Sequence, residues 1–457
     1  MMRLNIKNNL LKTGKAGRYI IYLLVITSLG YGISIKEYRS GDIIQWDVVS
    51  YYAYLPAIFI YKDLSFDFVK DLPDDFEGTI WPIPTSNGKH TLKYSIGTAI
   101  MCLPFFIVAH IYSSLAGIEA NGYTWPYQFF ILVAAIFYLL AGLLYLRKLL
   151  LNYFSENIVI ASLVILTLGT NLLYYSTTDP GMSHIYSFCL FSAFLFHITS
   201  FYQKEKWIDA LSIGVFSALI ILVRPSNILI FLFFLLYRGS YSLKDWSNFL
   251  WRNRSKLVVI LIIGLALLFL QLSYWKYSTG NWIYYSYGEE RFYFLKPHLI
   301  DGIFSYRKGW LVYTPLMTLA LIGFFFLRKK VPKLFYPILV FTVLNIYIVF
   351  SWWCWWYGGG FGARPLVESY ALLSLPIAAA VERLWNSGRL IKAISTVLVV
   401  FFIYLNIFQS RQYRIAHLHY ESTSKELYWA VFLNNKWPEN FEELLDHPDS
   451  EKAFRGE

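Results

Sequence analysis

The sequence predicts an all-α fold, a polytopic bundle of transmembrane helices. Of the 457 residues, 57% are hydrophobic and only 15% are charged, whereas a soluble domain usually has about 25% charged residues. Apolar runs of about 20 residues recur along the chain, which is roughly the length an α-helix needs to cross a bilayer. We therefore expect an integral membrane protein with about 11–13 spans, lined at its outer face by helices that lie along the membrane.

The basic residues predict the orientation of the chain. Positive charges (Arg3, Lys7, Lys12, Lys15 and Arg18) precede the first acid, Glu37, so the positive-inside rule places the N-terminus in the cytoplasm. Further basic clusters at 146–150, 203–207, 251–256 and 327–333 indicate later cytoplasmic loops. Because topology explains these charges, the net charge of +11 does not indicate a nucleic-acid partner.

The apolar runs predict eleven crossings in chain order. They lie near 18–35, 127–147, 158–173, 184–201, 208–223, 227–238, 256–275, 311–328, 333–351, 366–383 and 391–408. The apolar helix near 95–115 does not fit this alternation, so we interpret it as juxtamembrane or re-entrant, with an ordinary span as the alternative. The transmembrane domain covers 1–408 with a first outer loop at 36–94, and 409–457 is a short non-cytoplasmic tail.

The unusual polar residues fall on one predicted side of the membrane. The segments 36–94, 176–184, 276–310 and 351–365 all lie on the non-cytoplasmic side of this topology. A pore would instead distribute polar groups through the depth of the membrane. The topology therefore favours a site at the outer face.

Asp47 lies in an apolar and aromatic stretch, GDIIQWDVVSYYAYLPAIF, at 41–59. On a helix, Asp47 and Tyr51 share a face. A carboxylate at a half-dry interface has a raised proton affinity, which suits a general base; the alternative is a solvated interfacial acid. We expect Asp42 to be a helix cap.

Asp179 lies in a turn, STTDPGMSH, between two predicted spans, and His184 opens the following helix. The turn follows from Pro180 and Gly181. Two interpretations stay open, because Asp179 is either the cap of that helix or a second acid beside the site.

Basic residues in the outer segments are candidates for binding a phosphate. They are Arg291 beside Glu289 and Glu290, Lys308 beside Arg307, and Arg224 in LVRPSNILI. Arginine binds phosphate oxygens in pairs through its planar fork. The alternatives are anchoring to lipid headgroups and, for Arg224, a helix break with a snorkelling side chain.

The most distinctive stretch is WWYGGGFGARP at 355–365. Glycines at 358–360 let the backbone approach a ligand closely. Trp356 and its neighbours offer flat faces for a sugar ring or a prenyl chain, and Arg364 follows at the start of the next span. An aromatic belt at the interface explains the tryptophans but not the glycines together with Arg364.

Together these motifs resemble the GT-C superfamily of membrane glycosyltransferases, which includes protein O-mannosyltransferases and aminoarabinose transferases. The resemblance covers nearly the whole chain. It rests on Asp47 in QWDVVSYY, on the KYSIG turn with Lys93, Tyr94 and Gly97, on Asp179 in TTDPGMSH, and on the closing WWYGGGFGARPLVESYALLSLP. The last stretch looks like bacterial members of the family without an assigned substrate.

The resemblance implies an inverting transfer of a sugar from a polyprenyl-phosphate donor to a hydroxyl acceptor at the outer face of a bacterial inner membrane. Asp47 is then the base and Asp179 the second acid, while Arg364, Arg291, Lys308 and Arg224 hold the donor phosphate. The sugar and the acceptor (a glycan, lipid or protein) contact Trp46, Tyr51, Tyr52, His184, Glu289, Glu290 and Trp356. Some relatives carry a double acid where this chain has only Asp179, so a divalent metal stays open.

Two other functions remain as alternatives. A polysaccharide polymerase or ligase would depend on outer arginines and histidines rather than on Asp47. A flippase or transporter would show repeated halves with broken helices at matching positions, and the sequence has no such repeat. The predicted topology gives two geometric expectations: 41–59 does not cross the bilayer, and the carboxyls of Asp47 and Asp179 lie within about 15 Å of each other, the extent of one ligand cavity.

Overall fold

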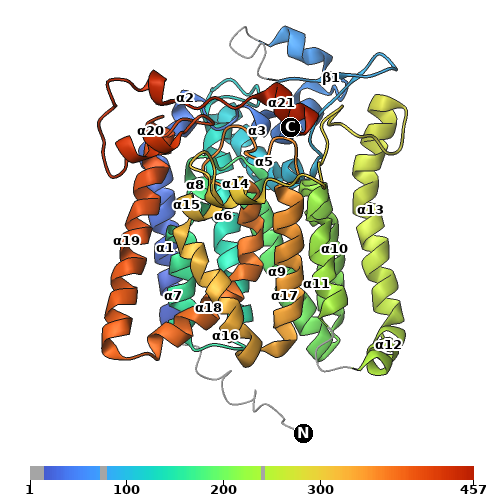
Figure 1. Ribbon diagram of the computed structural model, residues 1–457. Helices are drawn as coiled ribbons and strands as arrows, with labels where there is room; N and C mark the ends of the chain where they lie inside the picture. The colour runs from blue at the N-terminus through green and yellow to red at the C-terminus, as the bar shows by residue number, and fades with distance from the viewer. Residues whose placement is uncertain (1–14, 73–79, 238–241) are drawn as a thin grey trace. The chain divides into compact units, whose positions relative to one another are not determined.

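The computed structural model describes residues 15–72, 80–237 and 242–457 of the chain (Figure 1). The described residues are predominantly helical, and the one sheet among them has two strands, which confirms the all-α prediction. The basic residues Arg3, Lys7 and Lys12 lie outside the described residues, as do 73–79 of the predicted first outer loop.

Eight helices among the described residues are long and apolar enough to cross a membrane, which indicates an integral membrane protein. These candidate spans are Gly17–Ile35 in α1, Gly97–Leu115 (α5), Trp125–Leu150 (α6), Ser183–Lys204 (α9), Arg254–Thr279 (α13), Pro332–Val349 (α17), Arg364–Trp385 with α18, and Arg389–Arg414 (α19).

The other predicted spans correspond to shorter or interrupted helices. The apolar helices Glu156–Leu168, Trp207–Val223 and Pro225–Leu236 replace the predicted spans at 158–173, 208–223 and 227–238. Three short helical pieces that begin at Trp310 and end at Lys330 replace 311–328. Conversely, α5 is long and apolar enough to be the ordinary span that was the alternative for 95–115.

The chain divides into two compact units, and several helices contribute residues to both. Unit 1 comprises Met1–Thr27, Leu140–Leu173 and Phe292–Glu457, and unit 2 comprises Ser28–Leu139 and Tyr174–Arg291. The helices with residues in both units are α1 (Lys15–Ile35), α6 (Trp125–Leu150) and α8 (Leu172–Thr177).

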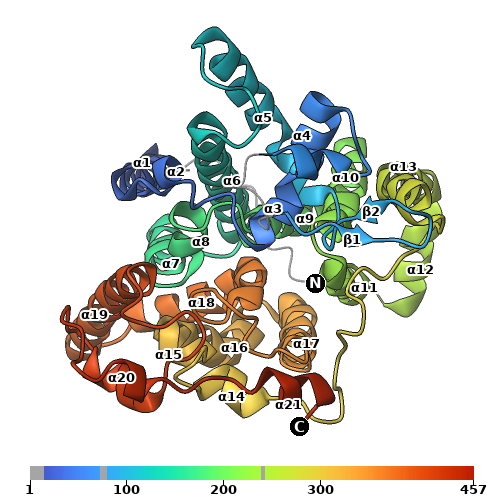
Figure 2. The ribbon, with the colours of Figure 1, turned by 90° about the horizontal axis from the view of Figure 1, so that it is seen from above.

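Unit 2 is organised around α9, of which 83% of the apolar window is buried. Helix α10 (Trp207–Val223) packs between α9 and α13, and α13 is only 11% buried over its window (Figure 2). The smaller elements are α2 (Glu37–Ser40), α3 (Asp47–Tyr52), α4 (Tyr54–Pro56), a π turn (Ala57–Tyr61), β1 (Ile83–Pro84), β2 (His90–Thr91), α11 (Phe231–Leu236), α12 (Leu243–Arg252), and 3-10 turns at Asp67–Asp71 and Pro225–Ile230.

Unit 1 is organised around α18 (Tyr370–Trp385), whose candidate span is 94% buried, whereas that of α19 is 11% buried. Helix α16 (Thr318–Lys330) packs closely against α18 at Gly323. A Cβ at this position would lie 1.9 Å from the Pro376 carbonyl oxygen. The remaining elements are α7 (Glu156–Leu168), α14 (Leu299–Phe304), α15 (Trp310–Tyr313), α20 (Lys425–Ala430), α21 (Ser450–Arg455), and 3-10 turns at Pro315–Met317, Arg364–Ser369 and Glu442–Leu444.

The stretch 41–59 forms no membrane-spanning helix, as predicted, but it is not one continuous helix. Gly41 ends α2 with a φ of 87°, and α3 begins only at Asp47. The expected cap role of Asp42 is wrong, since the N-cap of α3 is Trp46 and Asp42 instead accepts hydrogen bonds from the side chains of Ser40 and Gln45.

The tail boundary also differs, because α19 continues past 408 to Arg414. Its 26 residues give a helix of about 39 Å, longer than the roughly 30 Å hydrocarbon core of a bilayer. The last turns of α19 therefore carry polar residues beyond the apolar run.

Within unit 2, the first residue of α5 lies directly against α10. A Cβ on Gly97 would come within 2.2 Å of the backbone of Leu222 and Val223. We expect Gly97→Ala to lower the free energy of unfolding by about 1–3 kcal/mol, because backbone atoms cannot yield as side chains do. In α13, a Cβ on Gly264 meets nothing within 4 Å, so Gly264→Ala should be neutral or stabilising.

Thermal unfolding of both purified variants in the same detergent checks this. Equal melting temperatures for the two alanine variants would contradict the close approach of α5 and α10.

Candidate active site

Asp47 opens α3 and is half-buried, and the residue before it has a strained backbone. Trp46 has φ 52° and ψ −129°, a conformation that favours glycine. A non-glycine residue held in such a region costs on the order of 1–3 kcal/mol, and such strain gathers at functional sites. The Trp46 ring is 71% exposed and lies 6.0 Å from the ring of Trp81.

The hydroxyl of Tyr94 donates a hydrogen bond of 2.8 Å to Asp47 Oδ1. The Tyr94 ring stacks on Tyr51 with 4.2 Å between centroids, and Tyr54 donates from its hydroxyl to the Tyr94 carbonyl at 2.7 Å. A donor aimed at the ionised carboxylate stabilises that form. The KYSIG turn therefore holds the Asp47 side chain in one orientation.

The turn that carries Asp179 is in contact with α3. Gly181 lies so close to Val48 that a Cβ there would come within 2.2 Å of Val48 Cγ1. Ser183 Oγ also donates to the Tyr51 hydroxyl at 3.3 Å. Asp179 itself is half-buried, and Met182 holds the N-cap position of α9. The turn with Asp179 and the helix that Asp47 begins are therefore in contact within unit 2.

Arg224 and His184 form the basic part of this site. An Arg224 Nη lies 3.1 Å from His184 Nδ1. Because a guanidinium only donates, Nδ1 must accept, which makes His184 neutral with its proton on Nε2. His184 is buried at 2% exposure and meets the Tyr175 ring at 5.0 Å.

Lys93 and Tyr287 complete the group. Lys93 forms an ion pair with Glu290 and lies 5.1 Å from the centroid of the Tyr287 ring. Burial, with smaller contributions from Tyr51, Asp47 and Glu290, raises the pKa of Tyr287, and the charge of Arg224 opposes that shift. Tyr287 therefore stays a neutral donor among charged groups.

A small cavity lies within this group, with a volume of about 30 Å³. Its lining includes Tyr51, Lys93, Tyr94, Arg224 and Tyr287. That volume holds about one water molecule, so a larger ligand would enter only if these aromatic side chains moved apart.

Lys308 has a structural role in unit 1 rather than the expected place beside a ligand. It is 3% exposed, and its Nζ donates to the carbonyls of Gly360 and Tyr420. Burial, and then the charge of Arg364, lowers the pKa of Lys308 well below its usual value. Its Nζ also donates to the Tyr413 hydroxyl at 3.4 Å.

The glycine-rich loop is held by the same contacts. Gly358, Gly360 and Gly362 have φ of 60°, 150° and 62°, so the glycines provide backbone conformations that other residues avoid. Trp356 is buried and donates from Nε1 to Glu421 at 3.4 Å. Arg364 is half-buried at the start of the 3-10 turn.

The other predicted site residues lie at the edge of these groups or outside them. Tyr52 is buried and donates to the Gly122 carbonyl at 2.6 Å, which is a structural contact. Glu289 and Arg291 are exposed. The sequence prediction did not include Tyr287 or Ser183, and it noted Tyr94 only as part of a turn. No periodicity singles out Tyr287 or Ser183 among the many aromatics and hydroxyls.

The residues described do not form a metal site of three ligands. No group of three or more His, Cys, Asp or Glu gathers within 15–72, 80–237 and 242–457. A divalent metal therefore stays an expectation from the resemblance alone.

We expect Trp46→Gly to be more stable than Trp46→Ala by about 1 kcal/mol, because glycine adopts φ 52° without strain. The two variants both lose the indole ring, so their difference reports the backbone alone. Thermal unfolding measures this difference. A more stable alanine variant would show that the backbone at Trp46 is not strained.

We expect Lys308→Met to lower stability, since orphaning a buried carbonyl costs about 1–3 kcal/mol. The exposed Lys425→Met is the control. Because the pKa of Lys308 is lowered in the folded state, the unfolded chain binds more protons, so stability rises with pH up to the unfolded value. The parent should show this slope relative to Lys308→Met in pH-dependent melting; identical curves would contradict the burial of this amine.

Comparison with known proteins assigns no relative. No protein-family model matches the chain, and no curated protein matches its sequence.

Proposed function

We propose that the protein is an inverting membrane glycosyltransferase of the GT-C type that uses a polyprenyl-phosphate sugar donor. The observation that supports it most is the arrangement around Asp47. A half-buried carboxylate opens a short helix, accepts a hydrogen bond from Tyr94, and lies beside the turn with Asp179. Arg224 and His184 belong to the same unit.

In the proposed reaction, Asp47 takes the proton from the acceptor hydroxyl. The acceptor oxygen forms a bond to the anomeric carbon while the bond from that carbon to the donor phosphate breaks, which inverts the configuration. The polyprenyl phosphate leaves with the bonding electron pair. It needs charge neutralisation rather than a strong acid, and Arg224 is the cation of unit 2 best suited to supply it.

The remaining groups have supporting roles in this proposal. Tyr94 keeps Asp47 ionised and oriented, and Asp179 is a second acid that accepts hydrogen bonds from the sugar. Trp46, Tyr51 and Tyr287 provide aromatic faces for the ring. Arg364 of unit 1 remains a candidate phosphate ligand of that unit, whereas Lys308 drops out because its donors are engaged.

The proposed location is the inner membrane of a bacterium, with the site on the non-cytoplasmic side. A donor with a prenyl tail reaches an interfacial site sideways from the lipid, and the hydroxyl acceptor reaches it from water. The sugar and the acceptor are left open by this chemistry.

We expect Asp47→Asn to abolish transfer, at least 100-fold, with an unchanged melting temperature, because the amide cannot take a proton. Asp42→Asn is the matched control, since Asp42 is an exposed acid of the same segment whose carboxylate accepts from the side chains of Ser40 and Gln45. Mass spectrometry of glycans and lipid-linked sugars, in a deletion strain complemented with each variant, measures the product.

The same strain separates the alternatives. Full product with Asp47→Asn would remove Asp47 from the chemistry and favour a polymerase or ligase that depends on arginine and histidine. Accumulation of a lipid-linked sugar on the cytoplasmic side of the deletion strain would instead favour a flippase.

A further inference from the structure

A second, larger cavity lies in unit 1. It has a volume of about 730 Å³ between α16 and α17, in the range of ligand pockets. Its walls follow helical spacing: Leu321, Phe325 and Arg328 on α16 share one face, as do Phe335, Leu339 and Val343 on α17. This groove is apolar along its length and basic at one end.

The basic end lies where the two helices meet. Only Val331 separates the end of α16 from the start of α17, and Arg328 and Lys329 occupy the last turn of α16. The Arg328 guanidinium lies 5.7 Å from the Phe335 ring centroid, which joins the two walls.

The acids near this end already have partners. Glu382 accepts from Lys330 at 2.6 Å, and Glu156 pairs with Arg147 at 2.5 Å. Among the described residues, Arg328 and Lys329 are both exposed and neither forms an ion pair with an acid. Two positive charges therefore face outward at the end of an apolar groove.

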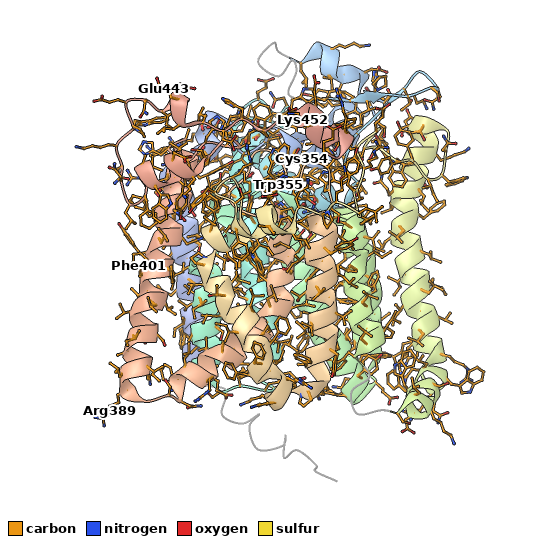
Figure 3. The ribbon with its side chains drawn as sticks, in the orientation of Figure 1. Cys354, Trp355, Arg389, Phe401, Glu443 and Lys452 are labelled. Carbon is orange, nitrogen blue, oxygen red and sulfur yellow. The ribbon has the colours of Figure 1, made fainter. Side chains whose placement is uncertain are left out.

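This end of unit 1 is opposite to the glycine-rich loop. Figure 3 shows Cys354 and Trp355 at one end of the unit and Arg389 at the other, and Figure 1 places the hairpin between α16 and α17 at the end with Arg389. The positive-inside rule assigns the basic cluster 327–333 to the cytoplasmic side. Anionic phospholipids give the cytoplasmic leaflet its negative surface potential, and basic pockets between helices on that side bind their headgroups.

We propose that the groove between α16 and α17 binds one anionic phospholipid, with its phosphate on Arg328 and Lys329 and an acyl chain along the apolar walls. Lipid tails are as apolar as these walls, so contact with the chain alone does not select a lipid. Selectivity must come from the two charges. The assignment is independent of the proposed glycosyl transfer.

The test uses the full-length protein in nanodiscs and native mass spectrometry, with phosphatidylglycerol and phosphatidylcholine of the same chain length as probes. We expect one phosphatidylglycerol to be retained in preference to phosphatidylcholine. Each basic residue near an anionic lipid raises the binding affinity about fivefold. The double variant Arg328→Gln with Lys329→Gln should therefore weaken phosphatidylglycerol binding roughly 30-fold. Arg383→Gln with Arg389→Gln is the control, because these exposed arginines lie on the same side but outside the groove.

A second pair of variants tests the groove without changing charge. Val343→Trp fills the groove and should release the phosphatidylglycerol. Val397→Trp on α19 is the matched control and should not release it, because Val397 is similarly exposed (68% against 57% for Val343) but lies outside the groove. Equal retention of both lipids, or equal loss in the two arginine pairs, would overturn the proposal. So would displacement by polyprenyl phosphate or stabilisation by inorganic phosphate alone, because the occupant would then be the donor carrier or a free anion.

Discussion

The hydrocarbon core of a membrane excludes ionised side chains that have no partner, and this exclusion determines where charged side chains can lie in the protein. The long helices keep their charges at their ends. In unit 2, Asp47, Asp179 and Arg224 all lie where a helix begins or ends. Helices α9 and α10 run antiparallel, so the start of one and the end of the other bring His184 and Arg224 into contact. The candidate site around Asp47 lies at these helix ends.

A buried polar pair between two helices of unit 2 shows how the constraint is met. His197 and Asp209 are buried between α9 and α10, with 2.8 Å between Nδ1 and Oδ1. Ser200 donates to the second oxygen of Asp209 at 2.8 Å. Each polar atom of the carboxylate thus has a partner, as a buried charge requires. This group joins the two helices near the end of α9 that is far from His184.

Two lysines, the half-buried Lys93 and the buried Lys308, show that residue type alone does not define a role. Lys93 pairs with the carboxylate of Glu290 beside the candidate site. Lys308 meets carbonyl oxygens instead and joins the glycine-rich loop to the C-terminal tail, where Arg307 also pairs with Asp446. Lys93 thus has a charged partner, whereas burial lowers the pKa of Lys308.

The sequence by itself determined the class of the protein, because helix length and low charge follow from composition alone. It also predicted that 41–59 does not cross the membrane, that His184 lies in the first turn of α9, and that Asp47 and Tyr51 share a helix. These are local properties, fixed within one or two turns of chain. The sequence did not predict that α7 and α11 are short, because an apolar run does not show where a helix ends.

Only the tertiary structure decided which polar residues meet. Tyr94 is 47 residues from Asp47 and Tyr51 is 132 from Ser183, and no periodicity connects such positions. The structure also distinguished Lys308, which resembles a phosphate ligand in sequence but donates to backbone carbonyls, from Arg224, which lines the small cavity of unit 2. The physical reason is that partners for buried charge come from distant segments, and packing alone selects them.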